Sequence, residues 1–240
     1  SLFYESRLST FSPVTTLERK NIKVIRPMIY IREKEILVKP YVTHGDIALK
    51  DDATKTSCFK SIVEIIKSFK RNYSLYPKDF FGVFHIIDTD GAFVGDEDYV
   101  LTKDGYFFDE EEGLIYSNDI ERSKEINIKK KEIYKYLTSL KKIDNVDYKV
   151  LFFSRNLEHA LYNKPNCNEE EKIKLSNEFE ETYENDANGF YKIIKEKSFN
   201  VPLTYDESWN YIMEKSNSIR RGENYIILLN MLKEYNSTNK

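Results

Sequence analysis

The feature that most constrains the fold is the run FFGVFHIIDTDG, residues 80–91, in which an apolar segment ends on two aspartates. Seven of the eight residues from 80 to 87 are apolar or glycine, which is typical of a strand covered on both faces. Asp88 and Asp90 follow at its carboxyl end, the edge at which open α/β sheets bind ligands. The run therefore predicts a central buried strand that leads into a polar site.

Composition and charge narrow the class of protein. The 240 residues are 40% hydrophobic and 32% charged, as in ordinary soluble chains. A net charge of −3 provides no global basic field, so any contact with nucleic acid has to be local. Two distant cysteines, Cys58 and Cys167, fit a reducing compartment, and the sequence has neither a long apolar run nor a signal-peptide pattern. We expect a soluble, cytoplasmic protein without membrane contact.

Several elements are predicted before the central strand. Residues 2–4 form a short apolar run that is either a first strand or a tail. Residues 22–30 and 35–42 are rich in β-branched and aromatic side chains, so they predict two strands that can pair as a hairpin. Apolar residues recur at helical spacing from residue 59 to residue 69 and predict an amphipathic helix.

A second helix and a second buried strand follow. Residues 126–140 predict a helix with a lysine-rich face, which includes the run from Lys129 to Lys131. Such a face is either solvated or in contact with phosphates. The segment YKVLFF, residues 148–153, predicts the strand. Because strand, helix and strand in this order form parallel pairs, the two polar strand ends should lie side by side. This places four residues near Asp88 and Asp90: Ser154, Asn156, Glu158 and His159.

The rest of the chain divides into an insertion and a helical region. Residues 92–125 are acidic with little periodicity, which indicates an irregular insertion or a small hairpin. Residues 168–240 have almost no strand pattern and predict about four helices. We therefore expect an α/β core over residues 1–165, with a mostly parallel central sheet flanked by helices, and a helical C-terminal subdomain over residues 166–240.

The combination of IIDTDG, a helix and YKVLFFSRNLEHALYN resembles the Toprim-related RloB-like proteins of phage-defence (abortive infection) loci. The resemblance covers roughly residues 36–165 and implies a Toprim-like fold with Mg²⁺ (or Mn²⁺) bound for phosphodiester chemistry. It assigns Asp88, Asp90 and Glu158 as metal-binding, catalytic carboxylates. The family also has a first-strand glutamate followed by glycine; this chain lacks that pair, and the nearest glutamates are Glu5 and Glu33.

The same site has a plain physical interpretation. Metal-bound carboxylates offset charge that develops on a phosphate, and Mg²⁺ needs only one or two of them beside water and substrate oxygens. His159 or Lys39 would then serve as a general base or an electrophile. Two structural interpretations stay open beside this one. The sequence DTDG also forms turns, and Glu158 also suits the first turn of a helix.

Paired arginines near the end of the chain are candidate phosphate contacts. Arg220 and Arg221 follow small hydroxyl residues in the segment SNSIRRG, and arginine binds phosphate by bidentate hydrogen bonds. The alternative is an exposed connection between helices. Ser154 and Asn156 complete the expected substrate contacts.

Three functions stay open at this point. The first is a Mg²⁺-dependent nuclease or other phosphodiesterase in phage defence, with nucleic acid as substrate. The second is a catalytically silent module that binds another protein of a defence locus. The third is a hydrolase of a small phosphorylated metabolite. No P-loop motif is present, so an ATPase partner would be a separate chain.

Overall fold

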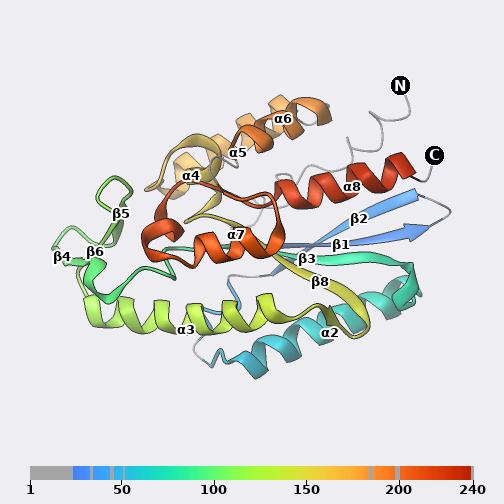
Figure 1. Ribbon diagram of the computed structural model, residues 1–240, viewed down its shortest axis with the longest axis horizontal. Helices are drawn as coiled ribbons and strands as arrows, with labels where there is room; N and C mark the ends of the chain where they lie inside the picture. The colour runs from blue at the N-terminus through green and yellow to red at the C-terminus, as the bar shows by residue number, and fades with distance from the viewer. Residues whose placement is uncertain are drawn as a thin grey trace.

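The computed structural model describes residues 24–32, 35–43, 46–50, 52–183, 186–197 and 201–238, and their side chains from residue 46 onward. A mixed sheet with the strand order β2-β1-β3-β8-β7 lies at the centre (Figure 1). Its strands are β1 (Val24–Arg32), β2 (Glu35–Thr43), β3 (Phe80–Asp88), β7 (Lys142–Ile143) and β8 (Val146–Phe153). The predicted α/β class is confirmed.

Only one neighbouring pair among the described strands of this sheet is parallel. β3 and β8 run in the same direction, whereas β1 is antiparallel to both β2 and β3, and β7 is antiparallel to β8. The expectation of a mostly parallel sheet is therefore wrong. The reason is that β1 and β2 form the predicted hairpin, and β1 lies between β2 and β3, so that β3 and β8 are the only described neighbours that a long crossover joins in parallel.

Two helices cover one face of the sheet, α2 (Lys55–Tyr73) and α3 (Ile120–Ser139) (Figure 1). Both predicted helices are confirmed. Thr54 caps α2 in a capping box with Ser57, and its apolar face lies in the core. α3 begins at Ile120 rather than at residue 126, because the Asp119 side chain accepts a hydrogen bond from the first turn.

The predicted insertion forms a second, smaller sheet. Its strands are β4 (Tyr99–Leu101), β5 (Phe107–Asp109) and β6 (Leu114–Ser117), in the order β4-β6-β5. The small hairpin expected within residues 92–125 is present as β5 and β6, and β4 joins it in parallel. Phe108 and Ile115 pack against Val94 and Ile219. The small sheet lies at the end of the large sheet where β3 ends (Figure 1).

The C-terminal helices pack on the sheet. The four predicted helices are α5 (Glu169–Tyr183), α6 (Ala187–Lys197), α7 (Tyr205–Ile212) and α8 (Ile226–Thr238). The shorter helices are α4 (Leu157–Tyr162), η1 (Pro77–Asp79), η2 (Asp96–Asp98) and η3 (Lys215–Ile219). Helices α5, α6 and α8 form one apolar cluster with Phe84 and Leu151 of the large sheet, on the face away from α2 and α3. On α7, Trp209 joins the other cluster, and its indole N–H donates to the Val150 carbonyl at 3.0 Å.

None of the helices that the structure describes is long and apolar enough to cross a membrane. The predicted strand or tail at residues 2–4 lies outside the described residues, as do Glu5 and Glu33. Lys39 lies in β2, in the part of the chain whose side chains are not described.

Candidate functional site

The loops after β3 and β8 lie side by side, as the sequence predicted. Asp88 pairs with Phe153 in the parallel register. Beyond this pair, the Asp90 N–H donates to the Arg155 carbonyl at 2.9 Å, and the Arg155 N–H donates to the Thr89 hydroxyl at 2.6 Å. The two loops therefore hold each other in place at the carboxyl edge of the sheet.

A buried lysine connects two carboxylates beside these loops. The Nζ atom of Lys130, on α3, lies 2.7 Å from Oδ2 of Asp90 and 3.2 Å from Oδ2 of Asp46, and its side chain is only 1% exposed. The Tyr134 hydroxyl, about one helical turn further on, donates to the same Asp46 carboxylate. Burial alone would lower the pKa of Lys130, but the charges of Asp90 and Asp46 outweigh burial and raise it. Lys130 is thus a fixed cation within the site.

Sequence reasoning missed the roles of Asp46 and Lys130. The lysine-rich face was expected to be solvated or to contact phosphates, whereas Lys130 is buried among protein carboxylates. A signal was present, because Lys130 lies three and seven residues before Ile133 and Leu137, on the same apolar face of the helix. Asp46 gave no such signal, since its partner Tyr134 is 88 residues away along the chain.

Asp88 is partly buried among like charges. Burial, followed by the negative charges of Asp90 and Glu158, raises its pKa well above the usual range of aspartate, and Lys130 offsets only part of this effect. Within the described residues, no hydrogen bond or ion pair to the Asp88 carboxylate is present. A cation at this position would relieve the repulsion among these carboxylates.

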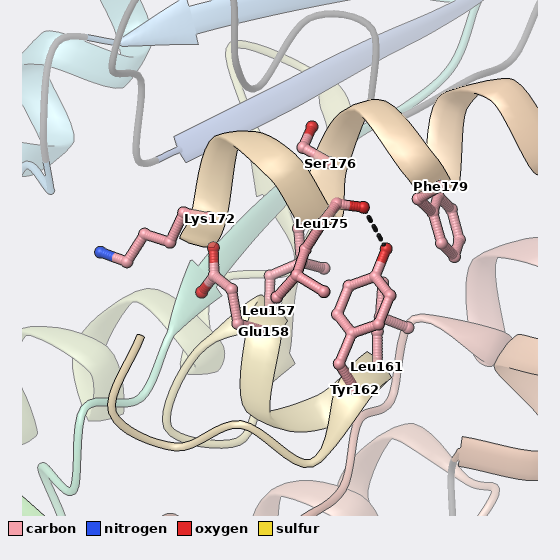
Figure 2. Close-up of a pocket in the computed structure, with 8 residues that line it drawn as sticks. All are labelled: Leu157, Glu158, Leu161, Tyr162, Lys172, Leu175, Ser176 and Phe179. Atoms are coloured by element: carbon pink, nitrogen blue, oxygen red, sulfur yellow. Dashed lines mark hydrogen bonds between the residues drawn. The ribbon is translucent and has the colours of Figure 1, made fainter. Parts of the chain in front are cut away.

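Glu158 lies in the first turn of α4, beside a small cavity between α4 and α5. Figure 2 shows its carboxylate pointing toward the start of α5, with Lys172 nearby. Burial raises the pKa of Glu158, and the charge of Lys172 acts in the opposite direction. The negative charge of Glu158 in turn raises the pKa of Asp88. Across the described residues, however, no group of three or more His, Cys, Asp or Glu side chains is arranged to hold a metal ion.

Ser154 and Asn156 bond to the protein backbone in this structure. The Ser154 side chain is buried, and its hydroxyl donates to the Arg220 carbonyl. Asn156 is the N-cap of α4, and its side-chain oxygen accepts from the His159 N–H at 2.8 Å. Both side chains shape the loop after β8, and their contact with substrate stays a prediction.

The paired arginines differ from each other. The Arg221 guanidinium donates to three backbone carbonyls at the end of α4, at 3.0 to 3.1 Å, so it stabilises that helix end. Arg220 is exposed.

His159 is buried and bonds to Glu110 rather than to the aspartates of the site. Its Nε2 atom lies 2.8 Å from Oε2 of Glu110. The predicted general base is thus paired with a carboxylate that the sequence did not single out.

The carboxylates at this edge fit a hard divalent cation in kind and number. Asp88 and Asp90 offer oxygen ligands, and Mg²⁺ in proteins is often bound through one or two carboxylates with water and substrate oxygens. Asp90 would share its charge between such an ion and Lys130. Glu158 stays a predicted third ligand.

Comparison of the chain with protein-family models, with curated proteins and with solved structures finds no match. The Toprim-like fold and the likeness to RloB-like proteins therefore stay predictions.

Proposed function

We propose that this chain is a Mg²⁺-dependent phosphodiesterase of the Toprim-like type that acts on nucleic acid, with Asp88 and Asp90 as metal ligands and Glu158 as a third catalytic carboxylate. The observation that carries the proposal is that Asp88 and Asp90 end β3 beside the loop after β8, which leads into Glu158. Burial and the charges of Asp90 and Glu158 raise the pKa of Asp88. Its position at the carboxyl edge of a parallel strand pair is where α/β sheets bind ligands. The role in phage defence, beside an ATPase or another protein of the same locus, rests on the resemblance to RloB-like proteins.

Each group of the chain has a distinct task in this proposal. A bound Mg²⁺ would offset charge on the phosphate and lower the pKa of an attacking water. Asp88 supplies a carboxylate with no other described ion pair, and Lys130 fixes the orientation of Asp90 through its 2.7 Å contact. Glu158 contributes negative charge from the first turn of α4. Lys130 also compensates the negative charges of Asp46 and Asp90.

The test is calorimetric titration of Mg²⁺ and Mn²⁺ into the wild type, Asp88→Asn and Asp147→Asn. Asp147 is the matched control because it lies near the amino end of β8, at the opposite edge of the sheet, with a side chain 67% exposed. We expect Asp88→Asn to bind the ion at least about tenfold more weakly, a difference of about 1.4 kcal/mol, and Asp147→Asn to bind like the wild type. The same loss should appear in hydrolysis of bis(p-nitrophenyl) phosphate and of single-stranded DNA or RNA. Equal metal binding by all three proteins would contradict the proposal.

The second candidate is the catalytically silent interaction module. Its supporting observation is that Lys130 already provides a cation for Asp46 and Asp90 without a metal. A lysine in that position can serve stability alone. Failure of the wild type to bind either ion, together with no hydrolysis of any phosphodiester, would favour this candidate.

A further inference from the structure

Arg155, between the two predicted substrate contacts, is a buried arginine to which the described part of the chain offers no hydrogen-bond acceptor. The residue is 6% exposed. The Nε and Nη1 atoms are buried, and neither has a hydrogen-bond partner among the described residues. The guanidinium carbon lies 3.9 Å from the centroid of the Phe108 ring, so the small sheet supports the group from one side. Nη2 is not fully buried, so it is the nitrogen of the guanidinium that solvent can reach.

The backbone holds this side chain in a strained conformation. Arg155 has a φ of +59°, a region that costs a non-glycine residue about 1–2 kcal/mol. Its N–H bonds to the Thr89 hydroxyl and, at 3.1 Å, to the Ser218 carbonyl, and its own carbonyl accepts from Asp90. Two separate segments, the loop after β3 and the segment at Ser218, thus fix the direction in which the side chain leaves the loop.

Stability alone does not account for an arginine here. A buried donor without a partner costs about 1–3 kcal/mol, and more when it is charged, whereas an apolar side chain of similar volume would avoid that cost. Burial lowers the pKa of Arg155 to about 10, so the group is still a cation at neutral pH. The free donors of the guanidinium need an acceptor with several oxygens. A phosphate offers them in the geometry that the planar arginine fork matches.

We propose that Arg155 is the anion-binding residue of this site and takes a phosphate group of the substrate. Its charge interacts with those of Asp90 and Glu158, which places it at the same edge as the proposed metal ligands. The inference rests on the proposed function, since these carboxylates repel a phosphate unless a cation offsets them. An oxyanion can reach the guanidinium at Nη2. Arg155, rather than the helix-capping Arg221, would then fix the substrate.

The test measures binding of inorganic phosphate by calorimetry, once with Mg²⁺ and once with EDTA, to the wild type, Arg155→Met, Arg155→Lys and Arg71→Met. Arg71 is the control because it is exposed in the last turn of α2. With Mg²⁺ we expect Arg155→Met to bind phosphate at least tenfold more weakly than the wild type. Arg155→Lys keeps the charge without the fork, so its affinity for phosphate should lie between those of the wild type and Arg155→Met. Arg71→Met should bind phosphate like the wild type. The melting temperature of Arg155→Met without phosphate should equal or exceed that of the wild type.

The outcomes separate this inference from the proposed function. Equal phosphate binding by the wild type and Arg155→Met, or no phosphate binding by the wild type, overturns the inference, and the Mg²⁺ titration of Asp88→Asn then decides the proposed function by itself. Phosphate binding in EDTA that depends on Arg155, without any Mg²⁺ binding, supports the anion site and contradicts the metal-dependent activity. A melting temperature of Arg155→Met well below that of the wild type would assign Arg155 a structural role, and Arg155→Lys then decides whether phosphate binding also needs the fork.

Discussion

Replacing Lys130 with methionine should destabilise the protein by about 3 kcal/mol. Methionine fills most of the volume of the lysine stem, so the change mainly removes the charge. The carboxylates left behind are 8% exposed at Asp46 and 40% exposed at Asp90. Loss of one partner of a buried ion pair costs about 3–5 kcal/mol, whereas a pair that solvent screens contributes about 1 kcal/mol or less. The loss of stability should therefore come mostly from the unpaired charge of Asp46. Because the Tyr134 hydroxyl still donates to Asp46, we expect a value near the lower limit of this range.

The assay is urea unfolding at pH 7 with EDTA, followed by circular dichroism. The denaturant slope should be unchanged and the midpoint lower. Lys135→Met, an exposed position on the same helix, is the control and should change stability by less than about 0.5 kcal/mol. A loss below about 1 kcal/mol in Lys130→Met would refute the view that Lys130 compensates a buried carboxylate. Under the proposed function, Mg²⁺ should then stabilise Lys130→Met more than it stabilises the wild type, since the ion meets less competition for Asp90.

Two further changes test the surroundings of the site. Burial raises the pKa of Glu223 to about 8, so the native state keeps a proton that the unfolded chain releases above about pH 4.3, and stability should fall between these two pH values. Glu223→Gln should remove this slope and gain at most about 3–4 kcal/mol at pH 7; parallel wild-type and variant curves in urea titrations from pH 5 to 8 would contradict this. Gly91→Ala should lose about 2–4 kcal/mol, because φ is +70° and a Cβ atom would lie 2.8 Å from Ile115 and Ile219. Gly105→Ala, with φ +96° and no described atom within 4 Å of such a Cβ, should lose only the conformational part in the same unfolding assay.

Much of the fold could be predicted from local patterns in the sequence. The strands at residues 80–88 and 146–153 and the helix at residues 55–73 follow from apolar runs and helical spacing, which depend on neighbouring residues alone. The relative directions of the strands could not be predicted, because one sheet can contain both hairpins, which give antiparallel pairs, and crossovers, which give parallel pairs. The strand β4 was missed as well, since its three residues are too few to show alternation.

The candidate site was predictable only in part. Asp88 and Asp90 follow directly from the strand that precedes them, and Glu158 from the next loop. Lys130 and Arg155 were not identified, because a charged residue becomes a site residue only through burial and partners that tertiary structure supplies. For Arg155 the supporting ring is Phe108, in an insertion that lacked any clear pattern.

The backbone bonds around Thr89 also bear on how the protein folds. The Thr89 hydroxyl donates to the carbonyl of Ser218, 129 residues later in the chain, and the same carbonyl accepts from the Arg155 N–H. Contacts of such high sequence separation form slowly, because closing a long loop loses entropy before any contact is gained. We expect the strands and helices to assemble before the two loops of the site reach their final geometry. A chain interrupted before Ser218 would keep Asp88 and Asp90 but lose the contact that orients the loops around them.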